Sequence, residues 1–156
     1  LREEGFRLLH FQEPALAVSP PNGQGFADLK DVYGNLRIPG AKTALHVYFG
    51  SARPHRPELL DFPADLVGLD LYQEDLDALQ EVDFTKTLVC GCVDGRNSHL
   101  EEPTEVAALV RRLRDGLNPP EVAIAPNADL EFLPRSVARA KVKVLGDAKR
   151  HLEDAD

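Results

Sequence analysis

The sequence contains no methionine, no tryptophan and only two cysteines among its 156 residues. Cys90 and Cys92 lie two positions apart, where a disulfide ring closes only with strain, so a secreted domain held together by disulfides is excluded. Two thiols without a nearby histidine or a second cysteine pair do not form a zinc site either. We therefore interpret both cysteines as small buried side chains of a core strand. Because the chain begins at Leu1 and offers no initiator methionine, we expect it to be part of a longer protein.

Long hydrophobic runs and positive charge are also scarce. No apolar run approaches the roughly 20 residues that a membrane-spanning helix requires, and no basic, apolar leader is visible. The chain carries 18 Lys and Arg against 26 Asp and Glu, and its formal net charge of −8 repels a nucleic-acid backbone. We expect an acidic cytoplasmic protein with no nucleic-acid and no membrane partner. Its 43% hydrophobic residues are enough for one domain with its own core.

Five short apolar runs are present, and each is followed by turn residues or polar residues. They span residues 6–11, 43–49, 66–71, 87–93 and 122–125. Near-continuous apolar runs rich in Val, Leu and Ile are typical of strands in a parallel sheet that is buried on both faces.

Helical patterns separate these runs. The expected helices span residues 57–62, 74–81, 102–115 and 134–152. The third begins with Pro103 in its first turn, carries one apolar stripe, and is expected to end at Gly116. The stretch 18–39 is rich in Gly and Pro, which predicts a loop with one weak helix near 26–33.

Strand and helix alternate strictly, which predicts right-handed crossovers and a parallel sheet. No Gly-x-Gly-x-x-Gly and no Gly-x-x-x-x-Gly-Lys sequence follows a strand, so neither NAD nor a nucleotide is expected. Polar residues gather just past the strand ends, where (β/α)8 barrels build their active sites. We therefore predict an α/β fold, a TIM (β/α)8 barrel. Residues 1–156 would form the carboxy-terminal part of a single barrel domain, about its last five β/α units, and three more units would come from sequence ahead of Leu1 or from another chain.

The first two strand ends carry candidate binding residues with two possible roles each. Gln12 and Glu13 follow the first strand, and Glu13 either holds a substrate ammonium group or caps neighbouring backbone amides. His46 shares a face of the second strand with Tyr48. It is either a ligand-binding residue or a hydrogen-bonded core residue.

The third and fourth strand ends carry charges that require partners. Asp70 is flanked by leucines on a strand expected to be buried, and burying an unpaired charge costs several kcal/mol. It therefore forms either an ion pair, with Arg96 as the candidate cation, or a substrate contact. Asp94, Arg96 and Asn97 surround a glycine turn after the fourth strand. Arg96 either binds a carboxylate through two parallel hydrogen bonds or forms a salt bridge at the barrel rim.

Five motifs, in order along nearly the whole chain, resemble the strand-end motifs of cobalamin-independent methionine synthases. They are Gln-Glu-Pro-Ala-Leu at 12–16, His-Val-Tyr-Phe-Gly-Ser at 46–51, Val-Gly-Leu-Asp-Leu at 67–71, Val-Asp-Gly-Arg-Asn at 93–97 and Asn-Ala-Asp-Leu-Glu-Phe-Leu-Pro at 127–134. The Tyr-Phe-Gly and Asp-Gly-Arg-Asn sequences are closer to the zinc-free amino-terminal barrel of that family than to its catalytic barrel.

The resemblance implies a catalytic zinc only in the family's carboxy-terminal barrel, where a His-x-Cys pair, a glutamate and a later cysteine bind it and homocysteine reacts as a zinc thiolate. By position, His46 matches the histidine and Asp70 stands in place of the glutamate. Tyr48 and Ala128 replace the two cysteines. His46 and Asp70 would bind zinc only if other ligands were supplied elsewhere, so no cofactor is expected from this segment. Gln12 also replaces the aspartate expected to hold the homocysteine amino group.

The function implied by the resemblance is methionine biosynthesis within one-carbon metabolism. The chain would be part of a longer methyltransferase, similar to 5-methyltetrahydrofolate–homocysteine S-methyltransferase, that transfers a methyl group to a thiol such as homocysteine. The expected residues binding an amino-acid or folate-like substrate are Gln12, Glu13, His46, Asp70, Asp94, Arg96 and Asn97. Its expected partners are the missing β/α units or another barrel subunit.

Two alternatives stay open. One is a catalytically degenerate barrel that acts as a scaffold, or that binds a small anion through Arg96 beside a separate catalytic subunit. The other is an unrelated (β/α)8 lyase or hydrolase that uses Glu13, Asp70 and Asp94 as paired carboxylates.

Overall fold

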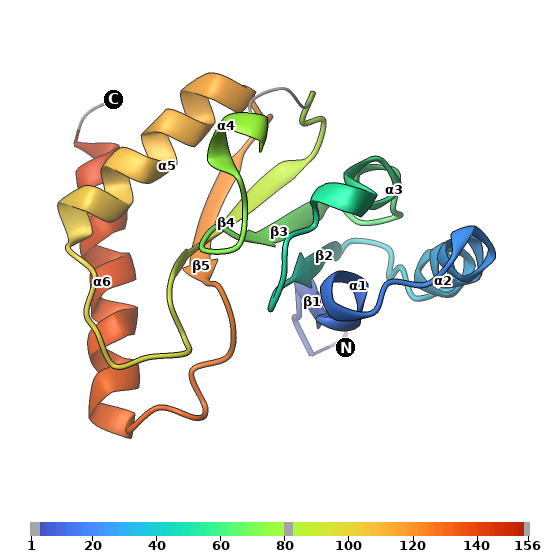
Figure 1. The fold of residues 1–156 in the computed structure, drawn as a ribbon. Helices are drawn as coiled ribbons and strands as arrows, with labels where there is room; N and C mark the ends of the chain where they lie inside the picture. Colours follow the sequence, from blue (N-terminus) through green and yellow to red (C-terminus); the bar gives the residue numbers. More distant parts are fainter. Residues whose placement is uncertain (1–3, 80–82, 155–156) are drawn as a thin grey trace.

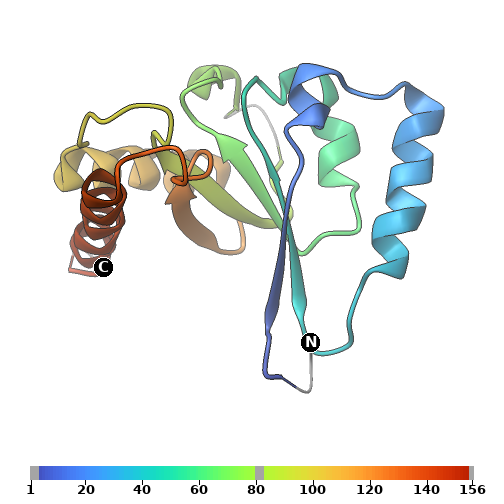
Figure 2. The same cartoon turned by 90° about the horizontal axis from the view of Figure 1, so that it is seen from below.

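A computed structural model describes residues 4–79 and 83–154, and a single parallel sheet lies at its centre (Figure 1). The strands are β1 (Leu8–Gln12), β2 (Lys42–Val47), β3 (Leu66–Asp70), β4 (Thr87–Val93) and β5 (Val122–Pro126). They pair in chain order, and every pairing is parallel. The sheet curls like half of a barrel (Figure 2). The predicted parallel α/β architecture is confirmed, and each strand overlaps its predicted apolar run.

The helices surround the convex side of the curled sheet (Figures 1 and 2). They are α1 (Ala15–Val18), α2 (Gly23–Asn35), the 3-10 turn η1 (Arg53–His55), α3 (Arg56–Leu60), α4 (Leu76–Leu79), α5 (Pro103–Leu117) and α6 (Arg135–Glu153). Within residues 4–79 and 83–154, no helix combines the length and the apolar character that crossing a bilayer requires.

The two faces of the sheet differ in what covers them. Strand residues that pack against the helices form the main core, and they include Leu45, Val47, Val67, Leu69, Leu88 and Cys90. A second, small cluster consists of Ala44, Leu66, Val89, Ala123 and Ala125. No helix residue in the described part of the chain belongs to that cluster, so strand side chains alone form this apolar patch of the concave face.

Both cysteines lie in the main core, as predicted. Cys90 and Cys92 are buried and free. Burial raises the pKa of both thiols, and that of Cys92 rises to about 12. A thiol that stays protonated is neither a nucleophile nor a metal ligand.

The helix predicted near 26–33 is confirmed, but it is longer than predicted, because α2 extends over thirteen residues from Gly23 to Asn35 and replaces much of the predicted loop. The side chain of Asn22 accepts a hydrogen bond of 2.9 Å from the Gly25 N–H and so caps the helix. Phe26 and Tyr33 are buried on its inner face. The cap and the two aromatic anchors outweigh the poor helix propensity of the glycines.

Two predicted helix boundaries also differ. Gly116 lies inside α5, and Asn118 ends the helix in the left-handed conformation, with φ 43° and ψ 49°. Asn is the residue other than Gly that most readily adopts this conformation. The helix predicted at 74–81 is confirmed only as the short α4, and its residues 80 and 81 lie outside the described residues.

Gly91 in β4 allows backbone segments to approach one another at the carboxyl ends of the strands. A Cβ atom at this position would lie 2.6 Å from the carbonyl oxygen of Leu69 and 2.8 Å from the Cα of Asn127. The register between β4 and β5 also shifts between Gly91 and Val93. Asn127 is held there by a hydrogen bond of 2.8 Å from its N–H to the Val93 carbonyl. A missing side chain in β4 therefore lets Asn127 reach the end of β3.

Replacing Gly91→Ala should lower the free energy of unfolding of the intact protein by about 3 kcal/mol, because the new methyl group overlaps backbone atoms. Gly146→Ala is the matched control, since Gly146 lies in α6 and a Cβ added there would meet no neighbouring atom within 4 Å. That substitution should be neutral or stabilise by about 0.5–1 kcal/mol. Urea unfolding measures both variants, and an unchanged midpoint for Gly91→Ala would contradict the close approach.

Candidate functional site

Polar side chains from three neighbouring strands meet at the carboxyl edge of the sheet. Asp70 ends β3 and is fully buried, Asp94 follows β4, and Asn127 follows β5. The Asn127 amide nitrogen donates hydrogen bonds to Asp70 Oδ1 at 2.9 Å and to Asp94 Oδ1 at 3.0 Å. Its amide oxygen accepts from the Gly95 N–H at 2.8 Å. One amide thus satisfies groups from two other strand ends.

Arg96 completes this network. Its Nε donates to Asp94 Oδ1 at 2.7 Å, and its Nη1 lies 3.2 Å from Asp70 Oδ2. The ion pair weighed for Asp70 in the sequence is therefore present. The guanidinium carbon also lies 6.0 Å from the centroid of the Tyr72 ring. Asn97 donates to Asp94 Oδ2 at 2.6 Å.

The two carboxyl groups of the network have different proton affinities. Burial raises the pKa of Asp70 and outweighs the hydrogen bond from Asn127 and the charge of Arg96. Burial opposes ionisation of Asp94 as well, but the hydrogen bonds from Arg96 and Asn127 hold its pKa below the ordinary value. Asp70 therefore keeps a proton to higher pH than Asp94, although both share the same cation.

A buried ion pair fixes the loop that carries Arg96. Lys141 in α6 is fully buried, and its Nζ lies 3.1 Å from both carboxylate oxygens of Glu101 and also donates to the His99 carbonyl. Glu101 Oε1 accepts from the Asp94 N–H at 2.8 Å and from the Tyr72 hydroxyl at 3.2 Å. Burial opposes the ionisation of Glu101, yet the hydrogen bonds and the Lys141 charge lower its pKa.

Sequence reasoning did not identify Glu101 or Lys141. Lys141 lies on the same helical stripe as Val137, Val144 and Ala148, so a charged residue in an apolar stripe was the available signal. A charge at such a position needs a buried partner.

Glu13 lies apart from the network. Its carboxylate accepts a hydrogen bond of 2.5 Å from the hydroxyl of Tyr33, which belongs to the helix-covered core. The lyase or hydrolase alternative needed Glu13 beside Asp70 and Asp94, and the described contacts join only the two aspartates.

Gln12 and His46 lie together on the concave side of β1 and β2. Gln12 Nε2 donates to Asp129 Oδ1 at 2.8 Å, and the Tyr48 hydroxyl donates to Gln12 Oε1 at 3.2 Å. His46 is 3% exposed and stacks on His10 with the ring centroids 5.5 Å apart. Gly68 makes room for it, because a Cβ there would lie 2.7 Å from the imidazole. Burial and the neighbouring His10 lower the pKa of His46 to about 4.

The residues at the family's zinc positions do not fit zinc. Tyr48 and Ala128 offer no thiolate, and both carboxylate oxygens of Asp70 are engaged by Asn127 and Arg96. Within residues 4–79 and 83–154, no group of three or more His, Cys, Asp or Glu side chains is placed to hold a metal ion.

Open space adjoins the network. A cavity of about 360 Å³ lies between Tyr48, Phe49, Arg96 and the segment 128–133, and a ligand there would contact the exposed part of Arg96. Phe49 lies two residues past the end of β2 and has φ 66°, a rare conformation for a residue other than Gly. Phe49 is 48% exposed and lines this cavity. The volume is within the range of small-molecule pockets.

Comparison with known proteins gives consistent results. A family model described as "Cobalamin-independent synthase, N-terminal domain" matches residues 1–118. The 5-methyltetrahydropteroyltriglutamate–homocysteine methyltransferase of Actinobacillus pleuropneumoniae serotype 5b (strain L20) is 34% identical over 140 residues, covering 88% of this chain and 18% of that protein. The protein of the same name from Neisseria meningitidis serogroup B is 40% identical over 99 residues, covering 62% of this chain and 13% of that protein. The chain thus spans less than a fifth of the length of these relatives.

One solved structure supports the fold. A B12-independent methionine synthase from Shewanella sp. W3-18-1, in complex with selenomethionine, superposes with a TM-score of 0.83 at 19% identity. The match covers 99% of this chain and 50% of that chain. At this level of identity the likeness establishes the fold alone.

Replacing Lys141→Met should lower the free energy of unfolding by about 3–5 kcal/mol, because the Glu101 carboxylate would stay buried without its cation. The double variant Lys141→Met with Glu101→Gln should regain part of the lost free energy of unfolding, because the unpaired buried carboxylate is removed as well. Lys143→Met is the control on the same helix, since Lys143 pairs with Asp147 at the surface and should change stability by less than about 1 kcal/mol. Urea unfolding of the four proteins is the measurement, and equal effects of the two lysine substitutions would contradict a buried pair.

Acid should weaken the fold through His46. Its pKa is about 4 in the folded protein and 6.5 in the unfolded chain, so the unfolded state binds the proton first. The stabilisation is complete above about pH 6.5 and is lost as the pH falls toward 4. When the pH is lowered from 7 to 5, the free energy of unfolding of the parent protein should fall by about 2 kcal/mol more than that of His46→Gln. Identical pH dependence in urea unfolding would count against a buried neutral imidazole.

Proposed function

Because the chain belongs to the cobalamin-independent methionine synthase family, we propose that it is part of the amino-terminal barrel of a methyltransferase that forms methionine. The match of residues 1–118 to that family's amino-terminal domain carries the proposal. In the proposed reaction, the sulfur of homocysteine bonds to the methyl carbon of a methyltetrahydropteroyl donor and the carbon–nitrogen bond of the donor breaks. The thiol proton leaves the sulfur, and the nitrogen that released the methyl group gains a proton.

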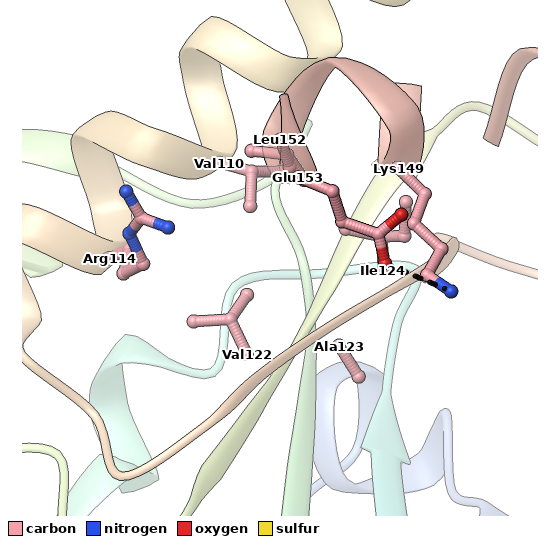
Figure 3. A pocket seen from close by; sticks show the side chains of 8 residues that line it. All are labelled: Val110, Arg114, Val122, Ala123, Ile124, Lys149, Leu152 and Glu153. Carbon is pink, nitrogen blue, oxygen red and sulfur yellow. Dashed lines mark ion pairs between the residues drawn. The ribbon is translucent and has the colours of Figure 1, made fainter. Parts of the chain in front are cut away.

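In this proposal the chain contributes the last five β/α units of one barrel domain. Each of the outer strands β1 and β5 has an edge that no described strand covers. A cavity of about 490 Å³ lies between α5, α6 and β5 (Figure 3). Val110, Val122, Ile124 and Leu152 line it, and the Lys149–Glu153 ion pair of 3.2 Å borders it. Such an apolar hollow beside an unpaired edge suits the packing of the remaining strands and helices.

The Asp70–Arg96–Asp94–Asn127 network is proposed to shape the rim against which the amino-acid or folate-like substrate binds. Barrel enzymes form their sites at this edge of the sheet, and the cavity beside Arg96 gives access to it. Because the residues at the zinc positions do not fit the metal, any zinc that activates the thiol would be bound outside this segment, by a second barrel or subunit.

A specific observation favours a second candidate, a catalytically degenerate barrel that acts as a scaffold for a separate catalytic subunit. The two carboxylates of Asp70 and Asp94 offset the single charge of Arg96. The Arg96 side chain is 30% exposed, which leaves limited surface for a small anion. A network that satisfies its own charges stabilises a rim without needing a substrate.

The intact protein distinguishes the two candidates. Metal analysis and a methyl-transfer assay with homocysteine and methyltetrahydropteroyltriglutamate should give a zinc-containing, active protein. In that protein, Arg96→Gln should reduce kcat/KM by about tenfold or more, through loss of charge-assisted hydrogen bonds at the rim. Arg112→Gln is the control, since Arg112 pairs with Asp77 at the surface. Inactive, zinc-free protein would contradict the methyltransferase proposal and support the scaffold candidate.

A further inference from the structure

A second cavity, of about 330 Å³, lies on the concave face of the sheet between the ends of β1 and β2 and the segment that follows β5. One wall is polar and consists of His10, Gln12, His46, Tyr48 and Asp129. The other wall is apolar and includes Ala125, Pro126 and Leu130. A ligand that fills this space needs one polar end and one apolar end.

The polar wall contains a buried atom without a partner. His46 Nε2 is inaccessible to solvent and forms no hydrogen bond with any described residue. Leaving such an atom unsatisfied costs about 1–3 kcal/mol. The ring does not turn away, because it stacks on His10 and contacts the backbone position of Gly68. The fold therefore holds an imidazole nitrogen at this wall without supplying its hydrogen-bond partner.

The charge of the cavity selects the kind of ligand. Asp129 is the charged residue of the lining, and no Lys or Arg is among the lining residues that the structure describes. Burial lowers the pKa of both His10 and His46, so both rings are neutral at pH 7. Asp129 lines the same cavity as both rings and Tyr48, and its charge favours a higher pKa for all three groups. Arg96 lies in the neighbouring cavity, where Asp70 and Asp94 bind it.

We propose that this cavity binds a small primary ammonium ion that carries a short apolar stem. The ammonium group donates one hydrogen bond to the Asp129 carboxylate. A small shift of the side chains that cover His46 Nε2 lets the ammonium group donate another to this nitrogen, in the tautomer that leaves the nitrogen unprotonated. The stem packs against Ala125, Pro126 and Leu130. An α-carboxylate on the same ligand would find no cation in the lining and would be repelled by Asp129. The proposal goes beyond the proposed methyl transfer and does not require it.

Calorimetric titration of the intact protein with four probes tests the charge selection. n-Butylammonium should bind in the millimolar range, and n-butanol, which has the same stem without the charge, about tenfold or more weakly. Butyrate should not bind. Norvaline, which adds a carboxylate to the amine, should also bind about tenfold or more weakly than n-butylammonium. Equal binding of butyrate and n-butylammonium would overturn the proposal.

Two further measurements locate the site. In protein with 13C-labelled histidine, n-butylammonium should shift the His46 ring resonance saturably. Asp129→Asn should weaken binding about tenfold or more, since the charged acceptor is lost. Asp28→Asn is a matched control, because Asp28 is also exposed and also accepts a hydrogen bond of 2.8 Å from a glutamine, Gln24. Both aspartates are exposed, so both variants should fold.

Unchanged affinity in Asp129→Asn, or no shift of His46, would contradict the assignment of this cavity. The outcome is separate from that of the methyl-transfer assay. Amine binding in an inactive protein would support the ammonium site and contradict the proposed methyltransferase. Methyl transfer without amine binding would support the methyltransferase and contradict the ammonium site.

Discussion

The amide side chain of Asn127 holds the carboxyl ends of three neighbouring strands together. Its nitrogen donates to Asp70 and Asp94, and its oxygen accepts from the backbone of Gly95. Two aspartates so close together would repel each other if both were ionised and unshared. The amide and the guanidinium of Arg96 lie between them and satisfy both, so the rim of the sheet depends on these two groups. This arrangement requires glycine at position 91, because any side chain there would displace Asn127.

The loop after β4 is fixed from outside the sheet as well. Glu101 accepts from the backbone of Asp94, and Lys141 of α6 neutralises Glu101 in a buried position. The last helix is therefore connected to the rim by charge, while apolar residues such as Val144 and Ala148 fix its position on the sheet. A displacement of α6 would expose a buried lysine and carboxylate and would also release the Asp94 backbone. The polar rim and the outer helical layer thus stabilise each other.

The sequence predicted the sheet well because a parallel strand buried on both faces leaves a contiguous apolar run, and five such runs are separated by helical patterns. The gathering of Asp70, Asp94 and Arg96 followed from topology, since parallel strands bring their carboxyl ends to one edge. The length of α2 was underestimated because its glycines suggested a loop, whereas its stability comes from Asn22 and from two distant aromatic contacts. Lys141 was missed because its partner lies forty positions earlier in the chain. Glu13 could not be placed from its neighbours, because Tyr33, which binds it, lies twenty positions later in the chain.

The polar residues around Arg96 and those around His46 differ in whether the fold satisfies all their hydrogen bonds. Around Arg96 every charge has an opposite charge or a donor, and the hydrogen bonds close on one another. Around His46, a buried nitrogen stays unsatisfied, a carboxylate has lone pairs to spare, and the described lining offers no cation. A network in which every polar group has a protein partner stabilises one geometry and gains little from a ligand. A network with an unsatisfied group gains a hydrogen bond when a ligand binds. By this reasoning, the first group builds the rim, and the second group is where the proposed ligand would supply an interaction that the fold lacks.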